Sequence, residues 1–285
     1  MKSVEAKATL PTFLICGAQK AGTTALYSAL QRHPDVCMSR PKETEFFSWR
    51  FDRGWEWFGT KFAHYNGEAA IGEASTRTMP TPQAPERICE RLPKARLIFV
   101  LRDPVERAHS AFWFYVSTGI LPAGTDFSTF IRNEGHPLRH EIIQYGQYEK
   151  HLRRFKNYFN EDQLLVLPYA DLRENATSLV HAVNEFIGVA PQEQPNSSVK
   201  KRNVTQHPSV AFAWAKGIWK SVQAGLHTVA PGIEDTLRKQ SKRLLLRGTR
   251  PPLSGEDVQY LYEIYRPTVE AMQLETNLDF SYWTR

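Results

Sequence analysis

The chain has 285 residues, a hydrophobic content of 41%, a mean hydropathy of −0.46 and a net charge of +6. This length suits one large α/β domain or two small ones, with enough residues to bury a sizeable core. No apolar run approaches the roughly 18 residues that a membrane helix needs, and the N-terminus lacks the apolar stretch of a signal peptide. Three isolated cysteines fit neither a disulfide framework nor a zinc site. We therefore expect a cytoplasmic protein without a transmembrane segment.

The first predicted element is a strand that leads into a glycine loop and a helix. Residues 13–16, FLIC, are apolar and predict a buried parallel strand. The loop that follows is made of Gly17, Ala18, Gln19, Lys20, Ala21 and Gly22, and Thr23 and Thr24 begin a segment with helical spacing. This order directs several backbone N–H groups and a helix N-terminus at one anion. The sequence therefore predicts a phosphate site at residues 17–24.

The loop resembles a Walker A sequence, GxxxxGK[ST], but Thr23 stands where that sequence has its lysine. An NTPase needs that later lysine on its β- and γ-phosphates. Here the lysine is Lys20, in the middle of the loop, which suits a single phosphate carrying a transferable group. A P-loop kinase acting on a small hydroxylated substrate is the alternative.

The next candidate chemistry lies after a short predicted strand at 36–38. Glu43 and Glu45 belong to the block PKETEFF and would point to the same side of an extended chain. The neighbouring Phe46 and Phe47 could desolvate Glu43 and make it a usable base. In the alternative interpretation, the segment is a surface loop that the two phenylalanines anchor.

Two more strands are predicted further along the chain. The aromatic residues of 50–68 indicate helical packing, and residues 69–73 predict a short strand that ends in Glu73. A helix is expected at 84–91. Residues 96–101, RLIFVL, predict a buried strand, adjacent or nearly adjacent to the strand at 13–16.

Arg102 follows this strand directly and therefore lies where α/β folds bind ligands. Asp103 is a predicted N-cap, and Pro104 fits the first position of the helix that follows. Ser110 lies about two turns into that helix. The alternative is that Arg102 only pairs with a neighbouring acid.

The later part of the chain carries the positive charge. Helices are expected within 126–160 and at 175–187, with a strand at 163–167. Residues 200–250 hold 11 Lys or Arg and 2 Asp or Glu, whereas the rest of the chain holds 25 and 28. This excess favours a localised anionic partner. A polyanion-binding module is a non-enzymatic alternative, but aromatic residues do not alternate with the charge as nucleic-acid stacking platforms do, so we expect no nucleic-acid partner.

Three blocks together resemble the PAPS-dependent sulfotransferases, and within them the heparan sulfate N- and 3-O-sulfotransferase-like branch and its bacterial relatives. The blocks are GAQKAGTTAL at 17–26, PKETEFF at 41–47 and LRDPVERAHSAF at 101–112. The resemblance implies one sulfotransferase domain over residues 1–285, with a P-loop-like α/β fold. Its central parallel sheet would have about five strands flanked by helices.

The resemblance also implies the reaction and the residues that perform it. A sulfuryl group would pass from PAPS to a hydroxyl of a glycan, lipid or small molecule, with PAP as product and no metal required. Lys20 would stabilise the leaving oxygen and Glu43 would be the base. The phosphosulfate would bind Gly17 to Thr24. The 3′-phosphate would bind Arg102 and Ser110, under a loop that contains Lys200, Lys201 and Arg202.

Two positions depart from the glycan-modifying members of this family. Those members often carry histidine two residues after the base, where this chain has Glu45. They tend to carry lysine after the glutamate that corresponds to Glu73, where this chain has Ala74. Both positions lie near the acceptor or sulfuryl group in the family. The differences argue against a heparan-like acceptor. The sequence identifies neither the acceptor nor the oligomeric state.

Overall fold

The computed structural model describes residues 9–191, 250–276 and 278–284. These residues fall into two compact units. The first unit contains residues 9–107, 144–191, 264–276 and 278–284, and the second contains 108–143 and 250–263. The extent of a single domain over 1–285 stays a prediction.

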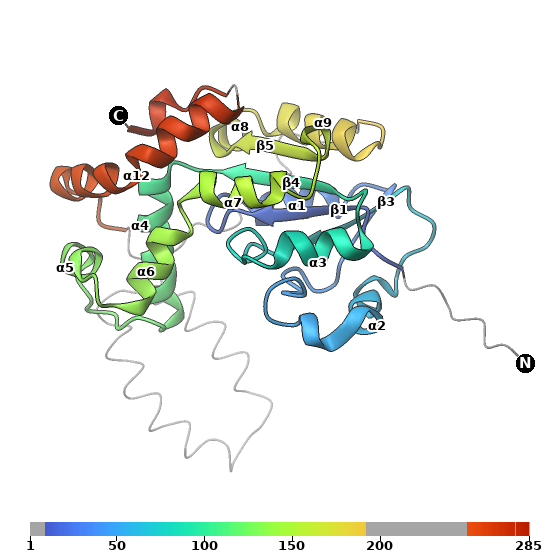
Figure 1. Cartoon of the computed structure of the whole chain (residues 1–285), viewed down its shortest axis with the longest axis horizontal. Helices are drawn as coiled ribbons and strands as arrows, with labels where there is room; N and C mark the ends of the chain where they lie inside the picture. The colour runs from blue at the N-terminus through green and yellow to red at the C-terminus, as the bar shows by residue number, and fades with distance from the viewer. Residues whose placement is uncertain (1–8, 192–249, 277, 285) are drawn as a thin grey trace, which may run out of the picture. The chain divides into compact units, whose positions relative to one another are not determined.

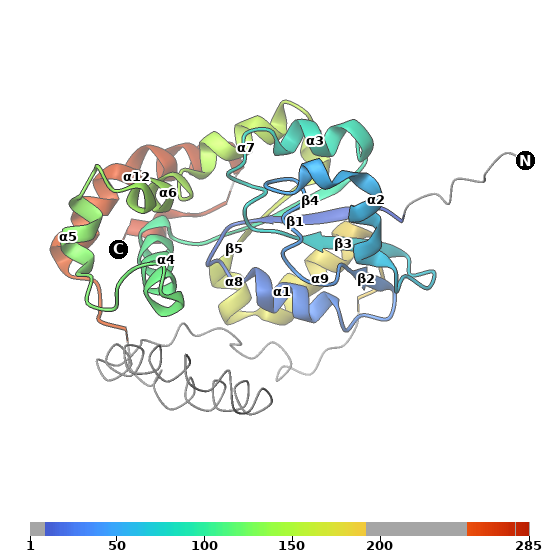
Figure 2. The same cartoon turned by 90° about the horizontal axis from the view of Figure 1, so that it is seen from below.

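The first unit contains a five-stranded parallel sheet with the strand order β2-β3-β1-β4-β5. Its strands are β1 (Phe13–Gly17), β2 (Val36–Met38), β3 (Ala70–Ala74), β4 (Arg96–Leu101) and β5 (Leu164–Pro168). Figure 1 labels β1, β3, β4 and β5, and Figure 2 also labels β2. In the register, Leu14 lies opposite Glu73 on one side and opposite Leu97 on the other. The predicted α/β fold, and the predicted pairing of 13–16 with 97–101, are confirmed.

Helices cover both faces of this sheet. Figure 2 shows α3 (Ala84–Arg91) and α7 (Tyr148–Lys156) on one face, and α1 (Thr23–Leu30), α8 (Tyr169–Glu174) and α9 (Ala176–Ile187) on the other. A parallel sheet buried on both faces selects continuous apolar strands rather than alternating ones. Every residue of β1 and β3 is accordingly buried.

The predicted helical segment at 50–68 is broken into three short pieces. They are η1 (Phe51–Arg53), α2 (Gly54–Gly59) and η2 (Thr60–Phe62). Phe46 lies in the middle of their aromatic side chains, with its ring 4.2 Å from that of Phe58 and 5.0 Å from that of Trp55, measured between centroids. The aromatic residues of this region thus form packing rather than a binding surface.

The remaining elements are α4 (Pro104–Thr118), α5 (Phe127–Arg132), α6 (Pro137–Gln144), η3 (Glu161–Gln163), α12 (Gly255–Thr276) and η4 (Ser281–Thr284). The boundary between the two units falls within α4, α6 and α12. The Asp103 cap of α4 is confirmed, because its Oδ1 accepts from the backbone N–H groups of Val105 and Glu106 at 2.7 and 3.0 Å. In the part of the chain that the structure describes, none of the helices has both the length and the hydropathy of a membrane span.

Candidate active site

The candidate site lies where the parallel strands end, because the loops that follow them meet at one edge of the sheet. Backbone hydrogen bonds join these loops to neighbouring strands. The Ala18 N–H donates to the Val100 carbonyl at 2.8 Å, and the Glu43 N–H donates to the Ala74 carbonyl at 2.9 Å. The Tyr27 hydroxyl of α1 also donates to the Ser39 carbonyl at 2.6 Å. The loop after β1 and the loop after β2 are therefore held in one framework.

The phosphate loop, residues 17–24, has a backbone that requires glycine at Gly22. Its φ is 85°, in the left-handed region. A Cβ atom added there would lie 2.6 Å from Leu172 Cδ2 and 2.9 Å from the Tyr169 ring. Lys20 has a φ of 69° in the same loop. The loop is thus a tight turn packed beneath α8.

The end of this loop fits a phosphate. Helix α1 begins at Thr23, and Gly22 at its N-cap has no side chain to accept from the first-turn amides. The first turn also contains no acidic residue. A bound anion would satisfy the amides and complement the positive end of the helix.

Arg102 lies against this loop, as the sequence predicts. Its Nη1 donates to the Lys20 carbonyl at 3.4 Å, and its guanidinium lies 5.1 Å from the centre of the Tyr169 ring. Arg102 also forms the ion pair with a neighbouring acid that the alternative interpretation expects, with Glu106 at 2.8 Å, but this is not its only contact. Arg102 therefore connects the start of α4 with the phosphate loop.

The structure does not test the other residues that the sequence assigns to a 3′-phosphate. Ser110 lies in α4, within the second unit, and its side chain is buried. Lys200, Lys201 and Arg202 lie outside the described residues. Their roles stay predictions.

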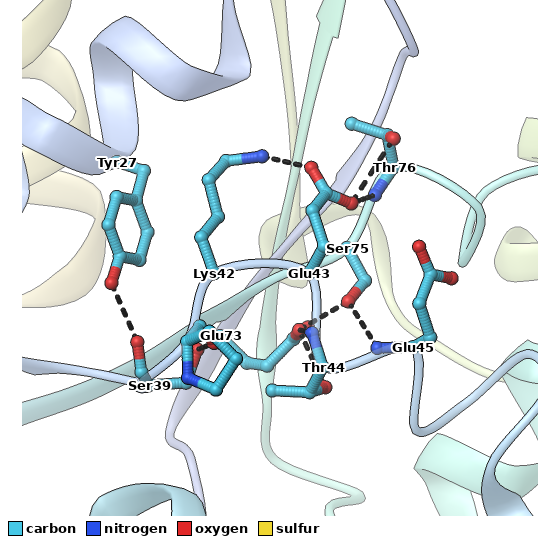
Figure 3. Close-up of polar contacts among 10 residues, drawn as sticks. Tyr27, Ser39, Lys42, Glu43, Thr44, Glu45, Glu73, Ser75 and Thr76 are labelled. Carbon is cyan, nitrogen blue, oxygen red and sulfur yellow. Dashed lines mark hydrogen bonds and ion pairs between the residues drawn. The ribbon is translucent and has the colours of Figure 1, made fainter. Parts of the chain in front are cut away.

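Glu43 is presented at the same edge of the sheet, between two donors (Figure 3). Its Oε2 accepts from the Thr76 backbone N–H at 2.8 Å and from the Thr76 hydroxyl at 3.3 Å. Its Oε1 forms an ion pair with Lys42. The Glu43 side chain remains 32% exposed, so it is fixed in direction while still open to solvent.

The expected extended conformation of this segment is wrong. Glu43 and Glu45 have φ values of 60° and 57°, and both residues are left-handed. The backbone turns because the Glu43 N–H binds the Ala74 carbonyl, while the Glu45 N–H donates to Ser75 Oγ at 3.0 Å. The two carboxylates consequently have different partners.

Glu45 has its own contacts in this turn. Its Oε2 accepts from the Ser48 hydroxyl at 2.7 Å. Burial raises the pKa of the Glu45 carboxyl, and the nearby Glu43 raises it further. Phe46 and Phe47 are fully buried in the aromatic cluster, so they anchor the segment, as the alternative interpretation proposes.

Glu73 makes contacts that the sequence does not predict. It is 1% exposed, and its Oε1 accepts from the Thr44 N–H at 3.2 Å, the Thr44 hydroxyl at 2.8 Å and the Ser75 hydroxyl. Burial raises the pKa of this carboxyl to about 7, against its hydrogen bonds, which lower it. The available signal was a glutamate within the otherwise apolar strand AIGEA. No spacing pattern predicted the contacts that Lys42 and Thr76 make with Glu43.

Comparison with known proteins gives the family. The family model described as "Sulfotransferase domain" matches residues 10–226, well over half of the chain. The chain belongs to the sulfotransferase family. The resemblance seen in the three sequence blocks is thereby confirmed. This sulfotransferase is a transferase enzyme, and the kinase-like alternative is not favoured.

Its relatives include much longer proteins. The sulfotransferase is 31% identical over 274 residues to the bifunctional heparan sulfate N-deacetylase/N-sulfotransferase 3 of Homo sapiens. It is 28% identical over 274 residues to the bifunctional heparan sulfate N-deacetylase/N-sulfotransferase 4 of Mus musculus. Each match covers 90% of this chain and 29% of the relative, so the chain spans under a third of their length.

A solved structure shares the fold. The sulfotransferase from Alicyclobacillus acidocaldarius matches with a TM-score of 0.71 at 21% identity. The match covers 97% of this chain and 100% of that one. The predicted arrangement of a parallel sheet with flanking helices therefore agrees with a known sulfotransferase.

Proposed function

We propose that this sulfotransferase transfers a sulfuryl group from PAPS to an acceptor hydroxyl. One observation carries the proposal: the phosphate loop follows β1, and the carboxylate of Glu43 is held by a residue that follows β3, the strand next to β1 in the sheet. Glu43 is held by Thr76, directly after β3, and β3 pairs with β1, which leads into the loop. In-line transfer needs this combination, an anion site for the leaving phosphate and a base for the attacking hydroxyl.

The phosphate loop would hold the 5′-phosphosulfate of the donor, which supplies the transferable sulfuryl group. The amides at the start of α1 and the Lys20 ammonium would stabilise the charge that develops on the leaving oxygen. Arg102 already contacts the loop through the Lys20 carbonyl. We assign the 3′-phosphate to Arg102 and Ser110, with Lys200, Lys201 and Arg202 as further ligands.

Glu43 would take the proton from the attacking hydroxyl. Its contacts support this role better than those of Glu73 and His33 do. Glu43 is partly exposed, whereas Glu73 is 1% exposed and cannot reach a substrate without a rearrangement. The ring of His33 accepts from the Asp35 N–H through Nδ1 at 3.1 Å and lies 2.9 Å from the Ala190 carbonyl through Nε2, so both nitrogens have structural contacts.

The acceptor class is wider than the names of the relatives suggest. Those names specify a heparan sulfate N-deacetylase/N-sulfotransferase. This chain has Glu45 and Ala74 at the two positions where the family resemblance leads us to expect histidine and lysine in glycan-modifying members. We retain a hydroxyl on a glycan, lipid or small molecule as the acceptor. The cytoplasmic location stays a prediction. No role assigned here uses a metal ion, so we expect EDTA to leave the transfer rate unchanged.

Nucleotide binding tests the donor assignment. Thermal unfolding should be followed with PAP, AMP and ATP in parallel. PAP at ~100 times its dissociation constant should add about 2.7 kcal/mol to the free energy of unfolding. AMP lacks the 3′-phosphate and should add much less. Equal stabilisation by PAP and AMP would remove the 3′-phosphate assignment, and stabilisation by ATP alone would favour a phosphotransferase.

A further inference from the structure

One oxygen of Glu73 joins the loops that follow two strands. Its Oε1 accepts two hydrogen bonds from Thr44, in the loop after β2, and one from Ser75, directly after β3. Ser75 Oγ in turn accepts from the Glu45 N–H. Figure 3 shows Glu73 beneath this segment, with Thr44 and Ser75 around its carboxyl group. A single buried carboxyl thus fixes both the residue after Glu43 and the one beyond it.

The segment that Glu73 holds has an unfavourable backbone conformation. Glu43 and Glu45 flank Thr44, and both have positive φ values. A residue other than glycine in the left-handed region is strained, and such strain persists only where the surroundings enforce it. The hydrogen bonds from Thr44 to Glu73 supply part of that enforcement. The Glu43 N–H bond to the Ala74 carbonyl and the Glu45 N–H bond to Ser75 Oγ supply the rest. The Glu73 carboxyl accepts the bonds from Thr44 even though burial of this carboxyl is itself unfavourable.

We propose that Glu73 is a positioning residue, which holds residues 43–45 in this left-handed conformation and thereby aims the Glu43 carboxylate at the acceptor. This inference rests on the proposed function, because it assigns a purpose to the direction of Glu43. In this proposal Glu73 itself touches neither PAPS nor the acceptor substrate. Its effect is transmitted through Thr44 and Ser75.

The surroundings of Glu73 indicate how such a device responds to pH. The titratable and charged groups that face it are Cys16 of β1, Tyr27 of α1 and Glu43, whose partner is Lys42. Burial raises the pKa of both Cys16 and Tyr27, so these two groups stay protonated near neutrality. Burial raises the pKa of Glu73 to about 7. A change in Glu73 charge near pH 7 would therefore act on the nearby Glu43 carboxylate.

Three variants separate positioning from simple stabilisation. Glu73→Gln keeps an oxygen for the same three donors and removes the titration. Glu73→Ala removes the oxygen that accepts these three hydrogen bonds. Glu149→Gln is the matched control, because Glu149 is another buried carboxyl of the first unit, on α7. Each variant should be measured for hydrogen exchange of the Thr44 amide, thermal stabilisation by PAP and transfer of labelled sulfuryl from PAPS.

We expect Glu73→Ala to expose the Thr44 amide to exchange and to lower turnover by about 10²-fold, the cost of misplacing a catalytic group by about 1 Å. Stabilisation by PAP should be unchanged. Glu73→Gln should keep the amide protected and turnover near that of the wild type, while losing any inflection of the rate near pH 7. Glu149→Gln should match the wild type in all three measurements.

The inference is overturned if Glu73→Ala leaves Thr44 protected, or if it lowers the unfolding temperature while turnover at saturation stays intact. If Glu73→Ala does not fold, Ser75→Ala removes one donor together with the acceptor for the Glu45 amide, and the same measurements apply. An absence of PAP stabilisation and of transfer in the wild type would instead reject the proposed function. The exchange of the Thr44 amide would still decide whether Glu73 holds the loop.

Discussion

The loop after β1 and the loop after β2 are both part of the candidate site, but they are built in opposite ways. The phosphate loop is shaped by its own backbone, through Gly22 and the start of α1. The Glu43 segment is shaped by contacts with a distant strand and the residues that follow it, through pairs 29 residues apart for Thr44 and Glu73 and 33 apart for Thr76 and Glu43. A loop of the first kind can be recognised in a short sequence block. A loop of the second kind depends on long-range contacts.

The strongest test of the second loop is Glu43→Gln, which keeps the shape of the side chain and removes its basicity. General-base catalysis typically contributes about 10²–10⁴-fold, so turnover should fall within that range. Stabilisation by PAP should stay unchanged, because Glu43 is assigned no contact with the nucleotide. Steady-state rates with labelled PAPS measure the effect.

Glu45→Gln is the matched control for Glu43, since Glu45 lies in the same turn and its carboxylate binds Ser48. Its effect should be much smaller. A Glu43→Gln enzyme with near-normal turnover beside an inactive Glu45→Gln enzyme would exchange the two assignments.

The corresponding test of the first loop is Lys20→Ala. Lys20 should act most strongly when charge appears on the leaving oxygen, so its loss should fall on turnover rather than on PAPS affinity. Removal of one such donor costs about 10²–10³-fold in other enzymes. Binding titrations with PAP and rates at saturating PAPS separate the two effects. Normal turnover with weakened binding would make Lys20 a simple phosphate anchor.

The pH dependence of the free energy of unfolding tests the buried carboxyl of Glu73, which contacts the loop after β2. The folded-state pKa of Glu73, about 7, lies above its ordinary value of 4.5, so the folded chain retains a proton that the unfolded chain loses. Stability should therefore fall as pH rises from about 4.5 to about 7, by about 3 kcal/mol. Burial raises the pKa of Asp103 to about 6, which acts in the same direction.

The contribution of Glu73 is isolated by comparing the wild type with Glu73→Gln in urea unfolding at each pH. The variant should lose about 3 kcal/mol less over this range. Parallel curves for the two proteins would show that Glu73 does not titrate there.

Gly22→Ala should have the smallest effect, and a different one, because it distorts the backbone of the first loop. The added Cβ would meet Leu172 and would force alanine into a left-handed conformation. We expect a loss of about 1–3 kcal/mol of stability together with weaker PAP binding. Gly67→Ala is a suitable control, since Gly67 also has a positive φ of 95° but has no atom near the added Cβ. Equal losses for the two variants would leave φ alone as the cause.

These differences explain what the sequence could predict. All five strands follow from apolar runs, and the phosphate loop follows from its glycines, because both depend on local chain properties. The left-handed conformations of Glu43 and Glu45 could not be foreseen, since they depend on Ala74 and Ser75. The glutamate at position 73 is visible in the sequence, but its contact with Thr44 could not be foreseen, because the two residues lie 29 positions apart.

Transfer of the sulfuryl group itself tests the central claim most directly. The protein should be incubated with sulfur-labelled PAPS and an extract of its source cells, and the labelled product should be identified by mass. With the wild type, we expect release of PAP coupled to one labelled product, the sulfate ester of a hydroxyl-bearing acceptor. With Glu43→Gln, we expect that product to be lost. A product labelled equally well by both proteins, or transfer of a phosphoryl group from γ-labelled ATP in a parallel incubation without transfer from PAPS, would contradict the account.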